Sequence, residues 1–381
     1  MTKKTLISLA IFTLSAFVLT ACAGVGPYGD KTAAGSLKIG FVGALTGDAA
    51  AYGDPSQKGV QLAVEELNAA GGIKGRQLVV IYEDAKCNGR DATTALQKLI
   101  NVDQVKIVIG GSCSGETLPM APIAENNQLL LFSPLATSPR ITNAGDFIFR
   151  NAPSDALAGD ALAKGAYNTF KYKKVALISE NTDYAQGIRE VFSKKFKELG
   201  GEIVADENYN PELTDFRAQL VKIKQTKPKA LLINSQGPQT GSLIAIQARE
   251  LALNVPILTN EVLGSTAGIK HAGDAVNGMV WAQPALDEES SPVTKQFLAA
   301  YRAKYNEEPS YPFYAATSYD ALKILAKGVE LVGEDTAKLR DWLYQLRNYD
   351  GASGVASIDE NGDTVRELLL FVAKNGKIER Y

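Results

Sequence analysis

The chain has 381 residues, of which 45% are apolar and 22% charged, with 40 basic and 42 acidic side chains and a net charge of −2. This balance excludes a nucleic-acid-binding protein that relies on a basic surface, and it leaves enough apolar residues for a large core. Roughly 345 residues follow the N-terminal segment, which is the length of two domains.

The N-terminus has the order of a secretory signal. Lys3 and Lys4 precede an apolar run from Leu6 to Leu19, and small residues follow that run. The run is too short to span a bilayer comfortably, and no stop-transfer pattern comes after it. We therefore expect residues 1–21 to be removed, which takes the net charge from −2 to −4 because two lysines are lost.

The residues before the first cysteine fit the bacterial lipobox. They read Leu19-Thr20-Ala21-Cys22, and in such a motif the cysteine sulfur receives a lipid that anchors the protein to a membrane. Cys22 is the expected lipidation site, with residues 22–36 as a tether. The alternative is an ordinary small-residue cleavage site with an incidental cysteine.

Two further cysteines, Cys87 and Cys113, form an even pair in an exported chain. An oxidising compartment permits disulfides, so we expect these two residues to be bonded, the alternative being two free buried thiols. A metal site is poorly supported, because the chain has no Cys-x-x-Cys motif and its single histidine is His271. No cofactor is expected.

From Leu37 onward, short β-rich runs alternate with longer amphipathic segments, which predicts parallel β-α-β units. In the first half we expect strands at 37–42, 78–82, 106–109 and 129–132, and helices at 59–69, 91–101 and 116–125. The pattern restarts after 147–153, with strands at 174–178, 202–205, 230–233 and 256–258, and helices at 156–169, 185–199, 216–224 and 241–251.

The C-terminal third has too few strands for a third domain. It contains helical patterns at 293–305, 313–331 and 336–346, followed by a hairpin near 359–363. We expect an α/β fold of two Rossmann-like lobes with parallel central sheets, joined by a hinge of several chain crossings near Ala152, Gln283 and Arg366. The predicted lobes are residues 37–152 plus 283–366 and residues 153–282 plus 367–381.

Five stretches carry a family resemblance. They are Gly43-Ala44-Leu45-Thr46-Gly47 through Tyr52-Gly53-Asp54, Asn68-Ala69-Ala70-Gly71-Gly72-Ile73-Lys74-Gly75, Ile109-Gly110-Gly111-Ser112-Cys113-Ser114, Ser133-Pro134-Leu135-Ala136-Thr137 and Asp183-Tyr184-Ala185-Gln186-Gly187. Together they resemble the periplasmic leucine/isoleucine/valine-binding protein family, from Leu37 to the C-terminus and most strongly in the first lobe.

The resemblance implies the type I periplasmic binding protein fold, whose lobes close on a small ligand. It also implies delivery of the ligand to a permease and ATPase. Together with the lipobox, this predicts a protein, expected to be a monomer, that is lipid-anchored on the extracytoplasmic side of a bacterial membrane. The implied ligand is an amino acid, branched-chain or a related aliphatic one.

The carboxyl ends of neighbouring parallel strands are the expected position of the ligand. Ser114 lies at a predicted helix start, and Leu135, Ala136 and Thr137 follow the next strand. Hydroxyls and free backbone amides at such places suit a carboxylate, and the resemblance assigns these residues to the ligand carboxylate. Serine and threonine in these turns are also ordinary helix caps, and the two roles are compatible.

The remaining ligand contacts are expected from the second lobe and from aromatic residues. Glu261 follows the strand at 256–258 and resembles the family acid that pairs with the ligand amine, although a solvated loop glutamate is the alternative. Tyr52 and Tyr184 are expected to close the pocket from opposite lobes, but with 15 tyrosines in the chain, packing explains either one almost as well. Gln236 stands where the resemblance implies a second aromatic, and its amide suits a polar ligand, which places leucine specificity in doubt.

An enzyme is the competing interpretation. Gly111-Ser112-Cys113-Ser114-Gly115 lies between a predicted strand and a helix, as a nucleophile elbow does, so Cys113 would be the nucleophile and His271 the base. A disulfide at Cys113 would exclude that reaction. Two more hypotheses keep the fold and change the function: a ligand sensor, and a binding protein for an amide, urea or aromatic acid.

Overall fold

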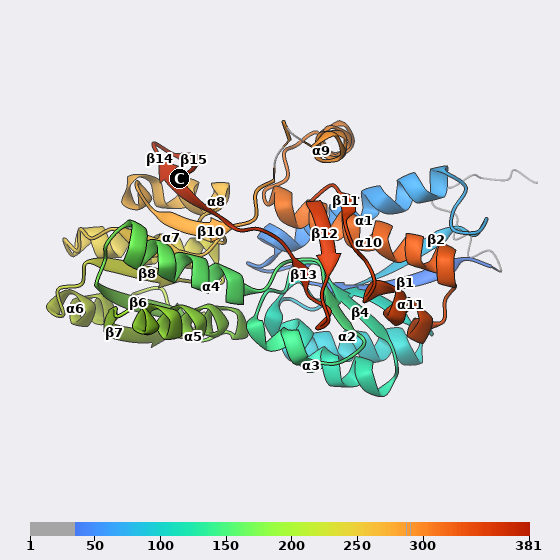
Figure 1. Ribbon diagram of the computed structural model, residues 1–381, viewed down its shortest axis with the longest axis horizontal. Coiled ribbons are helices and arrows are strands. Elements are labelled where there is room, and N and C mark those ends of the chain that lie inside the picture. The colour runs from blue at the N-terminus through green and yellow to red at the C-terminus, as the bar shows by residue number, and fades with distance from the viewer. Residues whose placement is uncertain (1–34, 287, 290) are drawn as a thin grey trace, which may run out of the picture. The chain divides into compact units, whose positions relative to one another are not determined.

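The computed structural model describes residues 35–286, 288–289 and 291–381, and Ser36–Tyr381 form one unit. This unit contains two largely parallel sheets with helices against them (Figure 1), which confirms the predicted α/β class. Within the described residues, no helix has the length and apolarity needed to cross a membrane. The expected signal at 1–21, the expected lipid site Cys22 and all but the last residues of the expected tether lie outside the described part.

The first sheet is entirely parallel and has the strand order β2-β1-β3-β4-β5. Its strands are β1 (Leu37–Gly43), β2 (Leu78–Asp84), β3 (Ile107–Gly110), β4 (Leu130–Ser133) and β5 (Ile148–Arg150). Alternate residues of β1 enter different cores: Ile39 and Phe41 face one core, and Val42 faces the other. Helices therefore cover both faces, as is usual for parallel sheets.

The helices of this sheet fall into two groups (Figure 1). One core includes residues of α1 (Ala50–Ala69), α10 (Pro312–Val332) and α11 (Thr336–Leu343), and the other includes α2 (Gly89–Asn101) and α3 (Ser114–Asn126). The helix α10 comes from the C-terminal third of the chain and packs along α1. This packing explains why that third needs no sheet core of its own.

The second sheet has the order β15-β14-β10-β9-β8-β6-β7. Its parallel strands are β6 (Lys174–Glu180), β7 (Glu202–Tyr209), β8 (Ala230–Asn234), β9 (Ile257–Thr259) and β10 (Val280–Gln283). Two antiparallel strands, β14 (Leu369–Lys374) and β15 (Lys377–Arg380), extend it beyond β10. The sequence analysis did not predict β10, β14 or β15.

The helices of the second sheet also form two groups. One core includes residues of α6 (Arg217–Gln225), α7 (Pro238–Glu250) and α8 (Thr266–Ala272). The other includes α4 (Asp155–Lys164), the π-helical turn Gly165–Thr169 and α5 (Asp183–Glu198). The expected helix at 156–169 is therefore an α-helix that ends in a π-helical turn.

The chain passes between the two sheets after β5, after β10 and before β14. Between the last two passages lie α9 (Pro292–Tyr305), α10, α11 and a small antiparallel sheet of β11 (Tyr349–Gly351), β12 (Gly354–Ile358) and β13 (Thr364–Val365). The predicted hairpin near 359–363 is confirmed as the link from β12 to β13. The exact lobe boundaries stay a prediction.

Two buried arginines join the first and third passages. Arg150 at the end of β5 donates to both carboxylate oxygens of Asp363 at 2.6 Å. Arg366 donates to the side-chain carbonyl of Asn151 at 3.2 Å. Each arginine is buried and hydrogen-bonded, so these contacts hold segments that lie more than 200 residues apart in the sequence.

Candidate functional site

The loops that follow β3 and β4 meet at the carboxyl edge of the first sheet. Ser114 is the first residue of α3, is 1% exposed, and its Oγ accepts the backbone N–H of Ser138 at 3.1 Å. Leu135, Ala136 and Thr137 follow β4 and are also buried. The sequence analysis placed these four residues together, and the structure brings them to one edge.

Thr137 connects this edge to an acidic pair. Its Oγ1 donates a 2.6 Å hydrogen bond to Oδ2 of Asp155, which begins α4. Burial raises the pKa of Asp155, and the nearby Glu261 carboxylate raises it further. The Thr137 hydroxyl therefore lies at the acidic end of the site, where it was not expected.

Glu261, which follows β9, is the second acid. Its Oε1 accepts hydrogen bonds from the hydroxyls of Tyr184 at 2.9 Å and Tyr314 at 2.7 Å. The side chain is half-buried, and this loss of solvent raises its pKa despite the two phenolic donors. Among the residues that the structure describes, no lysine or arginine forms an ion pair with Glu261 or Asp155. A cationic group would compensate both carboxylates.

Two cavities meet at these residues. The larger, about 520 Å³, is lined among others by Asp155, Glu261, Leu286 and Phe313. The smaller, about 20 Å³, is lined by Tyr52, Ser112, Cys113, Ser114, Leu135, Ala136, Thr137, Tyr184, Gln236, Val262 and Tyr314. Thr137 and Tyr314 line both, so the cavities adjoin. Every ligand residue expected from the sequence lines one or both of them.

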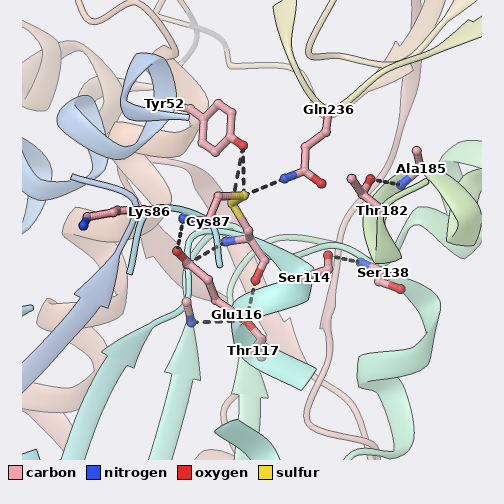
Figure 2. Close-up of a disulfide and its surroundings, with 12 residues drawn as sticks. Tyr52, Lys86, Cys87, Ser114, Glu116, Thr117, Ser138, Thr182, Ala185 and Gln236 are labelled. Atoms are coloured by element: carbon pink, nitrogen blue, oxygen red, sulfur yellow. Dashed lines mark hydrogen bonds between the residues drawn. A yellow bond between two sulfur atoms is a disulfide. The ribbon is translucent and has the colours of Figure 1, made fainter. Parts of the chain in front are cut away.

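The expected pairing of Cys87 with Cys113 is confirmed, and Figure 2 shows this disulfide. Its Cys113 half lines the smaller cavity. The Tyr52 hydroxyl lies 3.4 Å from the Cys113 sulfur and 3.6 Å from the Cys87 sulfur. Gln236 Nε2 lies 2.5 Å from the Cys87 sulfur. Tyr52 comes from α1 and Gln236 from the loop after β8, so side chains from both sheets converge on the disulfide.

Two buried glutamates accept hydrogen bonds from the backbone of the loops that carry the disulfide and Gln236. Glu116 of α3 is fully buried and accepts the backbone N–H of Cys87 at 2.7 Å and of Cys113 at 3.0 Å. Burial raises its pKa to about 7 against the opposing effect of these hydrogen bonds. On the second sheet, Glu180 accepts the backbone N–H of Gln236 at 2.7 Å, and burial raises its pKa as well. The backbone of both loops is thereby fixed.

The sequence analysis missed three residues of the site. Asp155 follows Ser154, whose side chain caps α4. In the sequence, these two residues indicate the start of a helix and give no sign of a ligand contact. The rings of Tyr311 and Tyr314 stack at the start of α10 with their centroids 5.6 Å apart. The sequence pattern there indicated only a helix that packs against a core. Tyr52 packs edge-on against both rings, so three tyrosines enclose the space beside Glu261.

The elements of the enzyme interpretation are not brought together. Cys113 is bonded to Cys87, so its thiol is not available as a nucleophile. His271 lies exposed on α8 and lines neither cavity. Within the described ranges, no group of three or more histidine, cysteine, aspartate or glutamate side chains could hold a metal ion.

Comparisons with known proteins agree with this geometry. The family model for periplasmic binding proteins matches residues 36–377. A leucine-, isoleucine-, valine-, threonine- and alanine-binding protein of Pseudomonas aeruginosa is 33% identical over 350 residues, which cover 91% of each chain.

Two solved structures are also similar. The leucine-binding protein of Thermotoga maritima has a TM-score of 0.84 at 30% identity, covering 91% of this chain and 97% of that one. A branched-chain amino acid transporter substrate-binding protein of Streptococcus pneumoniae, solved with isoleucine, has a TM-score of 0.82 at 32% identity, covering 90% and 98%.

Proposed function

This chain belongs to the periplasmic binding protein family, and from that premise we propose that it captures an α-amino acid between its two lobes for delivery to an ATP-driven importer. The family match also confirms the resemblance seen in the sequence. Its relatives are named for binding leucine, isoleucine and valine, and one of them also for threonine and alanine.

The observation that carries this proposal is the acidic pair opposite a helix start. Asp155 and Glu261 line the site, and no described lysine or arginine forms an ion pair with either, so an ammonium group would find two acceptors there. Ser114 Oγ at the start of α3 and the backbone after β4 line the adjoining cavity, where a carboxylate is favoured. An α-amino acid carries both an ammonium and a carboxylate group.

Closure of the lobes follows from the same arrangement. Ser114 and Thr137 belong to loops of the first sheet, and Glu261 belongs to a loop of the second. Only a conformation that brings both loops to the ligand makes all these contacts, so the ligand favours the closed state by its differential affinity. A transporter that prefers the loaded, closed shape would then accept the protein.

The partners and the location remain part of the proposal. The transporter would consist of a permease and an ATPase. The Streptococcus pneumoniae relative is named as the substrate-binding protein of a branched-chain amino acid transporter. Cys22 would carry the lipid that keeps the protein on the extracytoplasmic face of a membrane, as a monomer. A palmitate-labelling experiment that compares the wild type with Cys22→Ala tests the anchor, since label in both would contradict it.

The test of binding is isothermal titration of the purified protein with each of the twenty amino acids, with related amides and with aromatic acids. We expect binding of at least one α-amino acid and a loss of affinity on the order of 100-fold in Glu261→Gln, because an ammonium would lose its charged acceptor. Glu202→Gln is the matched control, since Glu202 is exposed at the edge of the second sheet. Binding of aromatic acids alone would keep the fold and overturn the proposed ligand.

A further inference from the structure

The smaller cavity has polar walls at the end that carries the disulfide. The Tyr52 hydroxyl and the Gln236 amide both point toward the disulfide sulfurs (Figure 2), and Ser112 lines the same cavity. Tyr52 and Ser112 are both about 5% exposed. With the ligand carboxylate at Ser114 and the backbone after β4, which line the same cavity, the disulfide end is where we place the ligand side chain.

These polar groups have few good partners within the described residues. Ser112 Oγ is buried and has no hydrogen-bond partner there. The Tyr52 hydroxyl contacts both disulfide sulfurs, which are weak acceptors, and it also hydrogen-bonds to the Gln236 side chain. Buried polar groups in native proteins are almost always paired with a strong partner, so Ser112 Oγ is left open for a ligand, and the Tyr52–Gln236 pair offers further donors and acceptors beside it.

An aliphatic ligand side chain would leave these polar groups without a hydrogen-bond partner on the ligand. It would exclude water from Tyr52, Ser112 and Gln236 and would offer no donor or acceptor in return. A hydroxyl or carboxamide of similar size would pair with them instead. Sites built to bond a ligand hydroxyl discriminate strongly against the analogue that lacks it, because the polar groups of the site are then left unpaired.

We propose that this protein selects an α-amino acid whose small side chain ends in a hydroxyl or a carboxamide, with Gln236 and Tyr52 as the residues that determine this specificity. This inference rests on the proposed amino-acid function and narrows its ligand class. The smaller cavity as a whole has a volume of about 20 Å³, which favours a compact polar group such as a hydroxyl at its disulfide end. Glu180 fixes the backbone of Gln236, and the torsions of the Gln236 side chain remain available for a somewhat larger group.

Two nearly isosteric pairs of ligands test the proposal. Threonine and valine differ by a hydroxyl in place of a methyl group, and asparagine and leucine by a carboxamide in place of an isopropyl group. In titration calorimetry on the wild-type protein, we expect threonine to bind at least tenfold more tightly than valine, or asparagine at least tenfold more tightly than leucine. Valine and leucine binding as tightly as their polar partners, or more tightly, would overturn the inference and leave the proposed amino-acid function intact.

Substitutions test whether Gln236 and Tyr52 cause the preference for polar over apolar ligand side chains. Gln236→Leu should reduce the polar-over-apolar affinity ratio at least tenfold, and Tyr52→Phe should reduce it severalfold while it keeps the aromatic packing with Tyr311 and Tyr314. Gln225→Leu, at the exposed end of α6, is the control and should leave the ratio unchanged. An unchanged ratio in both site variants would overturn the assignment to these residues, and binding of no α-amino acid at all would overturn the proposed function together with this inference.

Discussion

The Tyr314 hydroxyl donates a 2.7 Å hydrogen bond to Oε1 of Glu261. Tyr314 lies at the start of α10, which packs against the first sheet, whereas Glu261 follows β9 of the second. This hydrogen bond therefore joins the two halves of the protein at the acid that we expect to hold the ligand amine. We expect closure of the lobes and orientation of the acid to depend on this contact.

Loss of this hydroxyl should weaken binding through the closed state. We expect Tyr314→Phe to lower ligand affinity about fivefold, equivalent to about 1 kcal/mol for one hydrogen bond, with most of the change in the dissociation rate. Tyr184→Phe is the matched variant, because Tyr184 donates to the same oxygen from within the second half of the protein. Stopped-flow dissociation should show a larger increase for Tyr314→Phe, and equal rates in the two variants would argue against a role in closure.

The acidic pair makes ligand binding depend on pH. Burial raises the pKa of both Asp155 and Glu261 above the ordinary carboxyl values, so they take up protons at a higher pH than exposed acids do. A neutral carboxyl attracts an ammonium less, and affinity should therefore fall as the pH is lowered from about 8 toward about 5. Glu261→Gln should flatten this dependence in titrations at several pH values. A steeper loss in the variant than in the wild type would contradict the assignment.

Glu116 links stability to pH in the opposite direction from an ordinary salt-bridged acid. Its pKa is about 7 in the folded protein against 4.5 for the unperturbed group, so the folded state binds this proton more tightly than the unfolded state does. The stability that this proton uptake contributes is present below about pH 4.5 and is lost as the pH rises through 7.

Urea unfolding of the wild type and Glu116→Gln at several pH values between about 5 and about 8 measures this effect. The stability of the wild type relative to the variant should fall by about 3 kcal/mol over this range, since each pKa unit corresponds to about 1.4 kcal/mol. Asp84 at the end of β2 and Tyr52 on α1 interact with Glu116 electrostatically, and both are unchanged in the variant. A constant difference across this range would show that Glu116 titrates at its ordinary pKa.

The disulfide should contribute to both stability and binding. Cys87 and Cys113 are separated by 26 residues, and in the chain-entropy model a loop of this length contributes about 3 kcal/mol. The double variant Cys87→Ala with Cys113→Ala should lose about that much in urea unfolding. It should also bind ligand more weakly, because the sulfurs form the wall against which Tyr52 and Gln236 lie. Full retention of affinity would show that the wall does not depend on the bond.

Much of the site could be predicted because parallel strands end at a common edge. Ser114 and Thr137 follow neighbouring strands of the first sheet, and Glu261 follows a strand of the second, so position in the sequence places each of them at the carboxyl edge of its own sheet. Asp155 and Tyr314 lie at helix starts, and their place in the site depends on how the chain passes between the sheets. Local sequence patterns do not contain that information.

The start of α1 is a part of the fold that local sequence patterns also failed to predict. The sequence analysis expected a helix at 59–69, whereas α1 begins at Ala50 and contains Pro55. Proline cannot donate to the carbonyl four residues before it, which is that of Ala51. Ser310 Oγ donates to this carbonyl instead, at 2.8 Å, from a segment 259 residues away. A distant partner thus stabilises a helical turn that its own sequence disfavours.

The most direct test of the central claim is thermal unfolding of the protein with and without amino acids at about a hundred times their dissociation constants, in parallel with Glu261→Gln. A ligand at that concentration should stabilise the fold by about 2.7 kcal/mol. We predict a clear rise in Tm for the wild type with at least one α-amino acid and little or none for the variant. An equal rise in both proteins, or no rise with any amino acid, would contradict capture of an amino acid at Glu261.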